Sequence, residues 1–189
     1  MSQLLATISL RLQAQSPMRV SDDTAAPAAV AITLAPIGER GEILFIKRAV
    51  RASDRWSGQM ALPGGRLDTS DPDLMETAIR ETREETGIEL TRGMVLGELN
   101  DLRPTTPSLP PVLVRPFVFG LPERPTVIPN HEVAGHVWVH VDELEASERM
   151  TSVEVRDMRL NVPAFVLGPH VIWGMTHRII KPFLKLVNS

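Results

Sequence analysis

Short apolar runs with partial alternation are spread through the middle of the chain, and they predict β-strands. Residues 29–37 (AVAITLAPI) and 42–48 (EILFIKR) are rich in apolar and β-branched side chains, and a glycine-containing turn at 38–41 separates them. This arrangement predicts a β-hairpin. Further strands are predicted at 60–63, 94–99, 112–120 and 136–141.

Apolar residues recur every three or four positions at both ends of the chain and in one central segment. The spacing over residues 1–15 predicts a short amphipathic helix. Residues 72–86 predict a second helix, with Asp71 as the N-cap and Gly87 as the C-terminal stop. Two more helices are predicted at 142–149, capped by Asp142, and at 170–187.

Together these elements predict a single main domain of the α+β class, because strands outnumber helices and separate them. Residues 16–27 are polar and contain prolines, which is typical of a connector. We therefore expect an N-terminal helix and connector over 1–27 and the main domain over 28–189. The segment 150–169 has a mixed pattern that predicts no single element.

Composition and charge exclude several classes of protein. The 189 residues are 43% apolar and 23% charged, which is the balance of an ordinary globular domain. The net charge of −3, with no run of lysine or arginine, argues against a nucleic-acid partner. No apolar run approaches the length of a membrane span, so no membrane partner is expected. The lack of cysteine and of an evident targeting segment favours a cytoplasmic location.

The second predicted helix carries a group of like charges. Glu84 and Glu85 follow Glu81 by three and four positions, so the three carboxylates share one face. Neighbouring like charges destabilise a helix by roughly a few tenths of a kcal/mol per pair. Arg80 and Arg83 offset part of this repulsion. A solvated helix face is therefore the simpler interpretation of the helix considered alone.

The residues before this helix favour a metal site instead. The turn at Gly64-Gly65 brings bare backbone carbonyl groups near the start of the helix. Carboxylates combined with a backbone carbonyl and water form an all-oxygen site, which is the preference of Mg²⁺ and Mn²⁺. Metal ions held in this way can bridge to the oxygens of a di- or triphosphate.

At this segment the sequence resembles the Nudix hydrolases, whose motif is G-x5-E-x7-R-E-U-x-E-E-x-G-U, with U an aliphatic residue. The chain has Gly65, then Asp71 after five residues, then RETREETGI at 80–88 after eight more. It departs from the motif by the aspartate, by one additional residue and by Thr82 at the first U position. The R-E-x-x-E-E-x-G-U core is intact.

The departures themselves resemble the coenzyme A diphosphatase-like branch of the family. The residues that carry this resemblance are Asp68, Asp71 and Thr77-Ala78 in the motif, Arg48, Arg55, Gly58 and 63–65 before it, and 129–144 and 172–176 after it. The resemblance covers about residues 28–185. It implies a Nudix fold, in which a mixed β-sheet is sandwiched between α-helices.

The resemblance also implies a metal site with Mg²⁺ or Mn²⁺ as cofactor. Glu81 and Glu85 would ligate the cation, and Glu84 would join them directly or through water. The carbonyl group of Gly64 would be a fourth ligand. Arg80 would orient the glutamates by ion pairing, and the cation would activate a water for attack on phosphorus.

Other site residues stay open at the level of the sequence. Glu132 is one candidate for the general base, and Glu84 is the alternative. Arg48 and Arg55 are candidates for binding substrate phosphates, although either could be a solvated loop arginine. Trp56 could stack on an adenine base or pack within its loop.

The implied reaction is the hydrolysis of a diphosphate linkage in a nucleoside diphosphate derivative. Coenzyme A or an acyl-CoA is the favoured substrate, giving 3′,5′-ADP and 4′-phosphopantetheine or its acyl form. ADP-ribose, dinucleotides and nucleoside triphosphates are alternatives. A non-catalytic nucleotide-binding module is a rival of another class, but such modules typically lose the motif glutamates. The resemblance also leaves a homodimer open.

Overall fold

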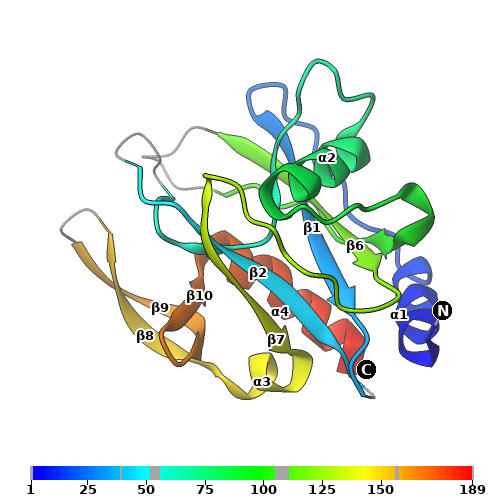
Figure 1. Cartoon of the computed structure of the whole chain (residues 1–189). Coiled ribbons are helices and arrows are strands. Elements are labelled where there is room, and N and C mark those ends of the chain that lie inside the picture. The colour runs from blue at the N-terminus through cyan, green and yellow to red at the C-terminus, as the bar shows by residue number, and fades with distance from the viewer. Residues whose placement is uncertain (1, 39, 52–55, 105–110, 156–157, 189) are drawn as a thin grey trace.

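Two β-sheets and four α-helices make up the described part of the chain (Figure 1). The computed structural model describes residues 2–38, 40–51, 56–104, 111–155 and 158–188. The helices are α1 (Gln3–Gln13), α2 (Leu74–Thr86), α3 (Val141–Ala146) and α4 (Gly174–Asn188), with a 3-10 turn η1 (Arg92–Met94). The larger, mixed sheet contains β1 (Ala26–Ala35), β2 (Glu42–Arg48), β3 (Met60–Ala61), β4 (Gly64–Arg66), β5 (Val95–Glu98), β6 (Val112–Gly120) and β7 (Val133–His140). The predicted α+β class with a mixed sheet between helices is confirmed.

Strand β1 lies at the centre of the larger sheet and is parallel to β6 along its length. It pairs with β2 only at Leu34 and Ala35, while Ala28–Val30 in its first half pair with β4. Strand β2 in turn pairs with β3 and β7. The predicted hairpin is therefore confirmed at its turn. At the other end β1 and β2 have different partners, and the segment carrying β3 and β4 lies between them.

Helix α2 covers one face of this sheet through small side chains (Figure 1). Ala78 is fully buried in a cluster with Ala29 and Ala31 of β1. Small side chains at a contact let a helix approach its neighbour closely. The side chain of Glu85, on the same helix, is thereby brought to the level of the sheet and is also buried.

The ends of α2 show one correct prediction and one error. Gly87 ends the helix in the left-handed conformation, with φ 71°, as predicted. The N-cap is Asp73, whose Oδ1 accepts two backbone N–H groups of the first turn at 3.0 Å each. The prediction of Asp71 as N-cap is wrong, because its carboxylate accepts hydrogen bonds from Thr77 and Arg80 instead.

Helices α1 and α4 pack on the opposite face. Their buried residues share one cluster with Ile32 and Leu34, which point away from α2 because side chains alternate along β1. The predicted N-terminal helix is confirmed, and Leu5, Ile8 and Leu12 are its buried residues. No helix in the described segments is long and apolar enough to cross a membrane.

The segment after β7 differs most from the sequence-based expectation. Strands β8 (Glu148–Val155), β9 (Met158–Leu167) and β10 (His170–Trp173) form a separate antiparallel sheet. The last helix therefore begins at Gly174, four residues later than predicted, and continues through Pro182. Asp142 is not the N-cap of α3, because that position is His140. Figure 1 shows the β8–β9 hairpin projecting from the body of the protein.

Candidate active site

Two glycines let strand β4 lie closely between β1 and the acidic face of α2. Gly64 has φ +151°, and a Cβ there would lie 2.3 Å from the carbonyl oxygen of Ala29. A Cβ on Gly65 would lie 2.4 Å from the carboxyl carbon of Glu81. Both distances are far below van der Waals contact, so glycine at 64 is needed for the approach of β4 to β1, and glycine at 65 for its approach to the Glu81 carboxylate.

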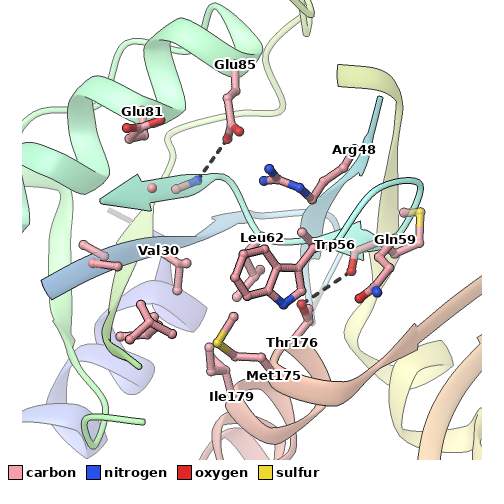
Figure 2. A pocket seen from close by; sticks show the side chains of 18 of the residues that line it. Val30, Arg48, Trp56, Gln59, Leu62, Glu81, Glu85, Met175, Thr176 and Ile179 are labelled. Atoms are coloured by element: carbon pink, nitrogen blue, oxygen red, sulfur yellow. Dashed lines mark hydrogen bonds between the residues drawn. The ribbon is translucent and has the colours of Figure 1, made fainter. Parts of the chain in front are cut away.

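Glu85 is the most deeply buried carboxylate of the motif. Only 3% of the residue is exposed, and its Oε2 accepts a hydrogen bond from the Gly64 N–H at 3.0 Å (Figure 2). Burial raises the pKa of Glu85 to about 7. The Gly64 hydrogen bond and the charge of Arg48 oppose this rise, and the charges of Glu81 and Glu132 add to it. The negative charge at Glu85 is therefore only partly compensated by the protein.

Glu81 lies beside Gly65, one helical turn before Glu85, and is also largely buried. Burial raises its pKa, and an ion pair with Arg80 opposes the rise. Glu84 is different, because 48% of its side chain is exposed and it does not line the pocket described below. The structure thus brings together two of the three predicted acids and places Glu84 beside them at the surface.

Arg80 connects the acids to one another. Its guanidinium donates to Glu81 Oε1 at 2.9 Å and to Glu84 Oε2 at 3.2 Å. It also makes a bidentate pair with Asp71, with both N–O distances 2.9 Å. Hydrogen bonding to Arg80 lowers the pKa of Asp71 to about 2. Arg80 also donates to the carbonyl oxygen of Arg66, and this hydrogen bond links α2 to strand β4.

Among the residues that the structure describes, no three His, Asp or Glu side chains are grouped so as to hold a metal ion. Glu81 is directed to Arg80, and Glu85 to the amide of Gly64. The donor set still fits a hard divalent cation, because it offers buried carboxylate oxygens whose charge the protein compensates only in part. Because Gly65 has no Cβ, the Glu81 carboxylate fits against the backbone of β4.

Glu132 approaches the same region from the segment before β7. It lines the pocket, and its backbone carbonyl accepts a hydrogen bond from Ala49 at 2.7 Å. Its carboxylate forms an ion pair with Arg51 at 2.8 Å. Arg51 was not identified from the sequence. It stands in a charged loop among several arginines, and no spacing rule distinguishes it from Arg48.

A pocket of about 330 Å³ lies next to these acids. Glu81, Glu85 and Arg48 line one end, and Trp56 lines the apolar remainder with side chains from β6 and α4 (Figure 2). The structure therefore brings Arg48 and Trp56 to the same cavity as the acids. Arg55, the other predicted phosphate-binding arginine, lies outside the described residues.

Comparison with known proteins places these features in a family. The model of the NUDIX domain matches residues 27–157. The chain belongs to the Nudix family. The matched range contains α2, the glycines of β4 and Glu132, and it ends within the β8–β9 hairpin.

Individual relatives agree with this assignment. Mitochondrial coenzyme A diphosphatase NUDT8 of Homo sapiens is 30% identical over 97% of this chain and 75% of its own length. The Nudix hydrolase NudL of Yersinia enterocolitica is 32% identical over 84% of this chain and 81% of its own. A MutT/nudix family protein from Enterococcus faecalis has a TM-score of 0.62 at 18% identity, covering 100% of this chain and 71% of that one. The predicted Nudix fold is confirmed, and the protein is a Nudix hydrolase.

Proposed function

We propose that this Nudix hydrolase cleaves the diphosphate linkage of coenzyme A or an acyl-CoA, giving 3′,5′-ADP and 4′-phosphopantetheine or its acyl form. The observation that carries the proposal is the meeting of Glu81 and Glu85 with the Gly64–Gly65 backbone at one end of a pocket. Similarity along nearly the whole chain to a human protein named as a coenzyme A diphosphatase supports the choice of substrate.

Glu81 and Glu85 would be the principal metal ligands. Their carboxylates are largely buried, close to each other and only partly neutralised, so a divalent cation would relieve the repulsion between them. Glu84, already half exposed beside Arg80, would reach the cation directly or through water. The carbonyl oxygen of Gly64 would complete the protein donors. A bound Mg²⁺ or Mn²⁺ would neutralise the diphosphate and lower the pKa of the attacking water.

Arg80 and Asp71 would keep the ligands in position. The bidentate pair fixes the guanidinium, and the guanidinium holds Glu81 and Glu84 on one side of α2. Partners of this kind orient ligating carboxylates without touching the substrate. Arg80 therefore acts on the reaction through the glutamates that it holds.

Glu132 would take the proton of the attacking water. It lines the pocket from the segment before β7, and its charge influences both Glu81 and Glu85. Glu84 remains the alternative base. Arg48, near Glu85, would contact a phosphate of the substrate, and its planar guanidinium suits that contact. Arg55 is a second candidate for the same contact, and Trp56 would pack against the bound substrate.

Retention of all three motif glutamates favours an enzyme over a non-catalytic nucleotide-binding module. The test is an assay of the purified protein with Mg²⁺ or Mn²⁺ on coenzyme A, octanoyl-CoA, ADP-ribose, NADH and dNTPs. Products are identified by mass spectrometry, and Glu85→Gln serves as the control for contaminating activity. We expect 3′,5′-ADP from the two coenzyme A substrates and none from the variant. Cleavage of dNTPs alone would overturn the proposed substrate. Cleavage of none of these compounds would overturn the proposal that the protein is an active diphosphatase.

A further inference from the structure

The pocket extends well beyond the acids into a part that we call the apolar end. Its walls come from elements far apart in the sequence, including the β3–β4 segment, β6 and the first turns of α4. The residues of the apolar end are Trp56, Leu62, Val112, Val114, Met175 and Ile179. In Figure 2, Trp56, Met175 and Ile179 lie progressively further from Glu81 and Glu85.

Charge is distributed unequally between the two ends of the pocket. Among the described lining residues, the cationic side chains are Arg48 and Arg66. The guanidinium of Arg48 lies on the Glu85 side of Trp56 (Figure 2), and the carbonyl group of Arg66 bonds to Arg80 of α2. Next to the apolar end, the described lining residues with uncharged polar side chains include Gln59 and Thr176, whose hydroxyl donates to the carbonyl of Met60 at 3.4 Å.

The two arms of coenzyme A differ in the surroundings that they need. One arm is an adenosine that carries an additional 3′-phosphate dianion, and burying such a charge without a cation is strongly unfavourable. The other arm is the uncharged pantetheine chain, which ends in a thiol or an acyl thioester. Each methylene group of an acyl chain favours binding when it moves from water into an apolar pocket.

We propose that the apolar end binds the pantetheine arm with its acyl thioester, and that it makes acyl-CoA a better substrate than free coenzyme A. This inference rests on the proposed function. The diphosphate then lies at the acids and Arg48, and the 3′-phosphoadenosine extends away from the apolar end. Trp56 packs against the acyl-pantetheine arm in this arrangement, and not against adenine.

Met175 offers a selective test, because it is partly buried, lines the apolar end and stands in the first turn of α4. An aspartate in a first turn is compatible with the helix dipole, so Met175→Asp alters the pocket wall without opposing the helix. Met175→Leu is the conservative control. Met150→Asp, at a methionine that is 58% exposed and outside the pocket lining, controls for the added charge.

The assay compares kcat/KM for octanoyl-CoA and for free coenzyme A. In the wild type we expect a ratio of at least about 10, and Met175→Asp should bring it close to 1, while Met175→Leu and Met150→Asp retain it. Equal rates on both substrates in the wild type would overturn this inference and leave the proposed function standing. If the wild type cleaved neither octanoyl-CoA nor free coenzyme A, the proposed function itself would be overturned.

A binding measurement tests the same inference without turnover. Calorimetry with the products separates the two arms: S-octanoyl-4′-phosphopantetheine represents one and 3′,5′-ADP the other. Met175→Asp should weaken binding of the acyl product at least tenfold and leave 3′,5′-ADP unchanged. Weaker 3′,5′-ADP binding with unchanged acyl-product binding would place the adenosine arm at the apolar end and overturn the inference. Circular dichroism confirms that the variant is folded.

Discussion

Asp71 binds Arg80 along one edge of the guanidinium, with Oδ1 accepting from Nε and Oδ2 from Nη2 at 2.9 Å each. In the Nudix motif this position is a glutamate, with seven residues between it and the arginine. Here the side chain is one methylene shorter and the spacing is one residue longer, and the pair still forms. The loop before α2 is thereby tied to the arginine that lies among the candidate metal ligands.

Asp71→Asn removes the charge of this pair and one side of its bidentate contact. Because Arg80 would then hold Glu81 and Glu84 less firmly, we expect kcat/KM for coenzyme A to fall about 10- to 100-fold, the range typical of partners that orient ligands. The concentration of Mg²⁺ at half-maximal activity should rise as well. Asp68→Asn is the matched control, since Asp68 is exposed and its carboxylate accepts hydrogen bonds from the backbone and the hydroxyl of Ser70. Equal kinetics of both variants would contradict the assigned role.

Glu85→Gln should stabilise the metal-free protein at alkaline pH although it removes activity. Folding raises the pKa of Glu85 from about 4.5 to about 7. A carboxyl whose pKa is raised on folding lowers stability as pH increases from 4.5 through 7. At pH 8 in EDTA, urea titration should therefore give the variant a free energy of unfolding higher by roughly 3 kcal/mol, and the difference should disappear as the pH falls below about 4.5. A less stable variant at pH 8 would contradict this account of the buried charge.

Gly65→Ala should disturb the metal site more than the fold. The added Cβ would lie 2.4 Å from the Glu81 carboxyl carbon, the far end of a flexible side chain that can move aside. We expect little change in melting temperature and at least about a tenfold loss of affinity for Mn²⁺. Gly135→Ala is the control, because a Cβ there meets no atom within 4 Å. Unchanged Mn²⁺ affinity in Gly65→Ala would show that Glu81 is not a ligand.

Arg51→Ala tests whether the ion pair with Glu132, 2.8 Å long, positions a general base. Removal of a general base costs typically about 10²- to 10⁴-fold in rate, and removal of its partner should cost less. We expect kcat to fall in Arg51→Ala and more strongly in Glu132→Gln, with no additional loss when the two are combined. Additive losses would mean that Arg51 and Glu132 act separately. The control is Arg124→Ala, because Arg124 forms an ion pair with Glu42 and neither residue lines the pocket.

The elements around the site could be predicted from the sequence because each carries a strong local signal. Strands β2 and β6 have the predicted bounds, 42–48 and 112–120, since both are apolar runs bordered by turn residues. Helix α2 ends at Gly87 as expected. Its start was misplaced by two residues because Asp71 and Asp73 are equally good caps by type, and only the tertiary contact with Arg80 distinguishes them.

The β8–β9–β10 sheet was not predicted because its first part is largely exposed. Most of β8 and the first half of β9 are exposed, so residues 148–161 lack the continuous apolar runs that mark the buried strands 42–48 and 112–120. In β10, the apolar spacing of His170–Trp173 continues that of α4 and was included in the helix. Prediction of the site from the sequence was also limited. The motif predicts Glu81 and Glu85 but not the ion pair between Arg51 and Glu132.

The central claim is that Glu81 and Glu85 hold a divalent cation beside Gly64. A calorimetric titration with Mn²⁺ tests it most directly, using the wild type and the Glu81→Gln/Glu85→Gln variant at pH 8, with folding of both checked by circular dichroism. We predict saturable binding to the wild type and binding at least tenfold weaker in the variant, which should also fail to cleave coenzyme A. Equal Mn²⁺ affinity of the two proteins, or no binding to the wild type, would contradict the claim.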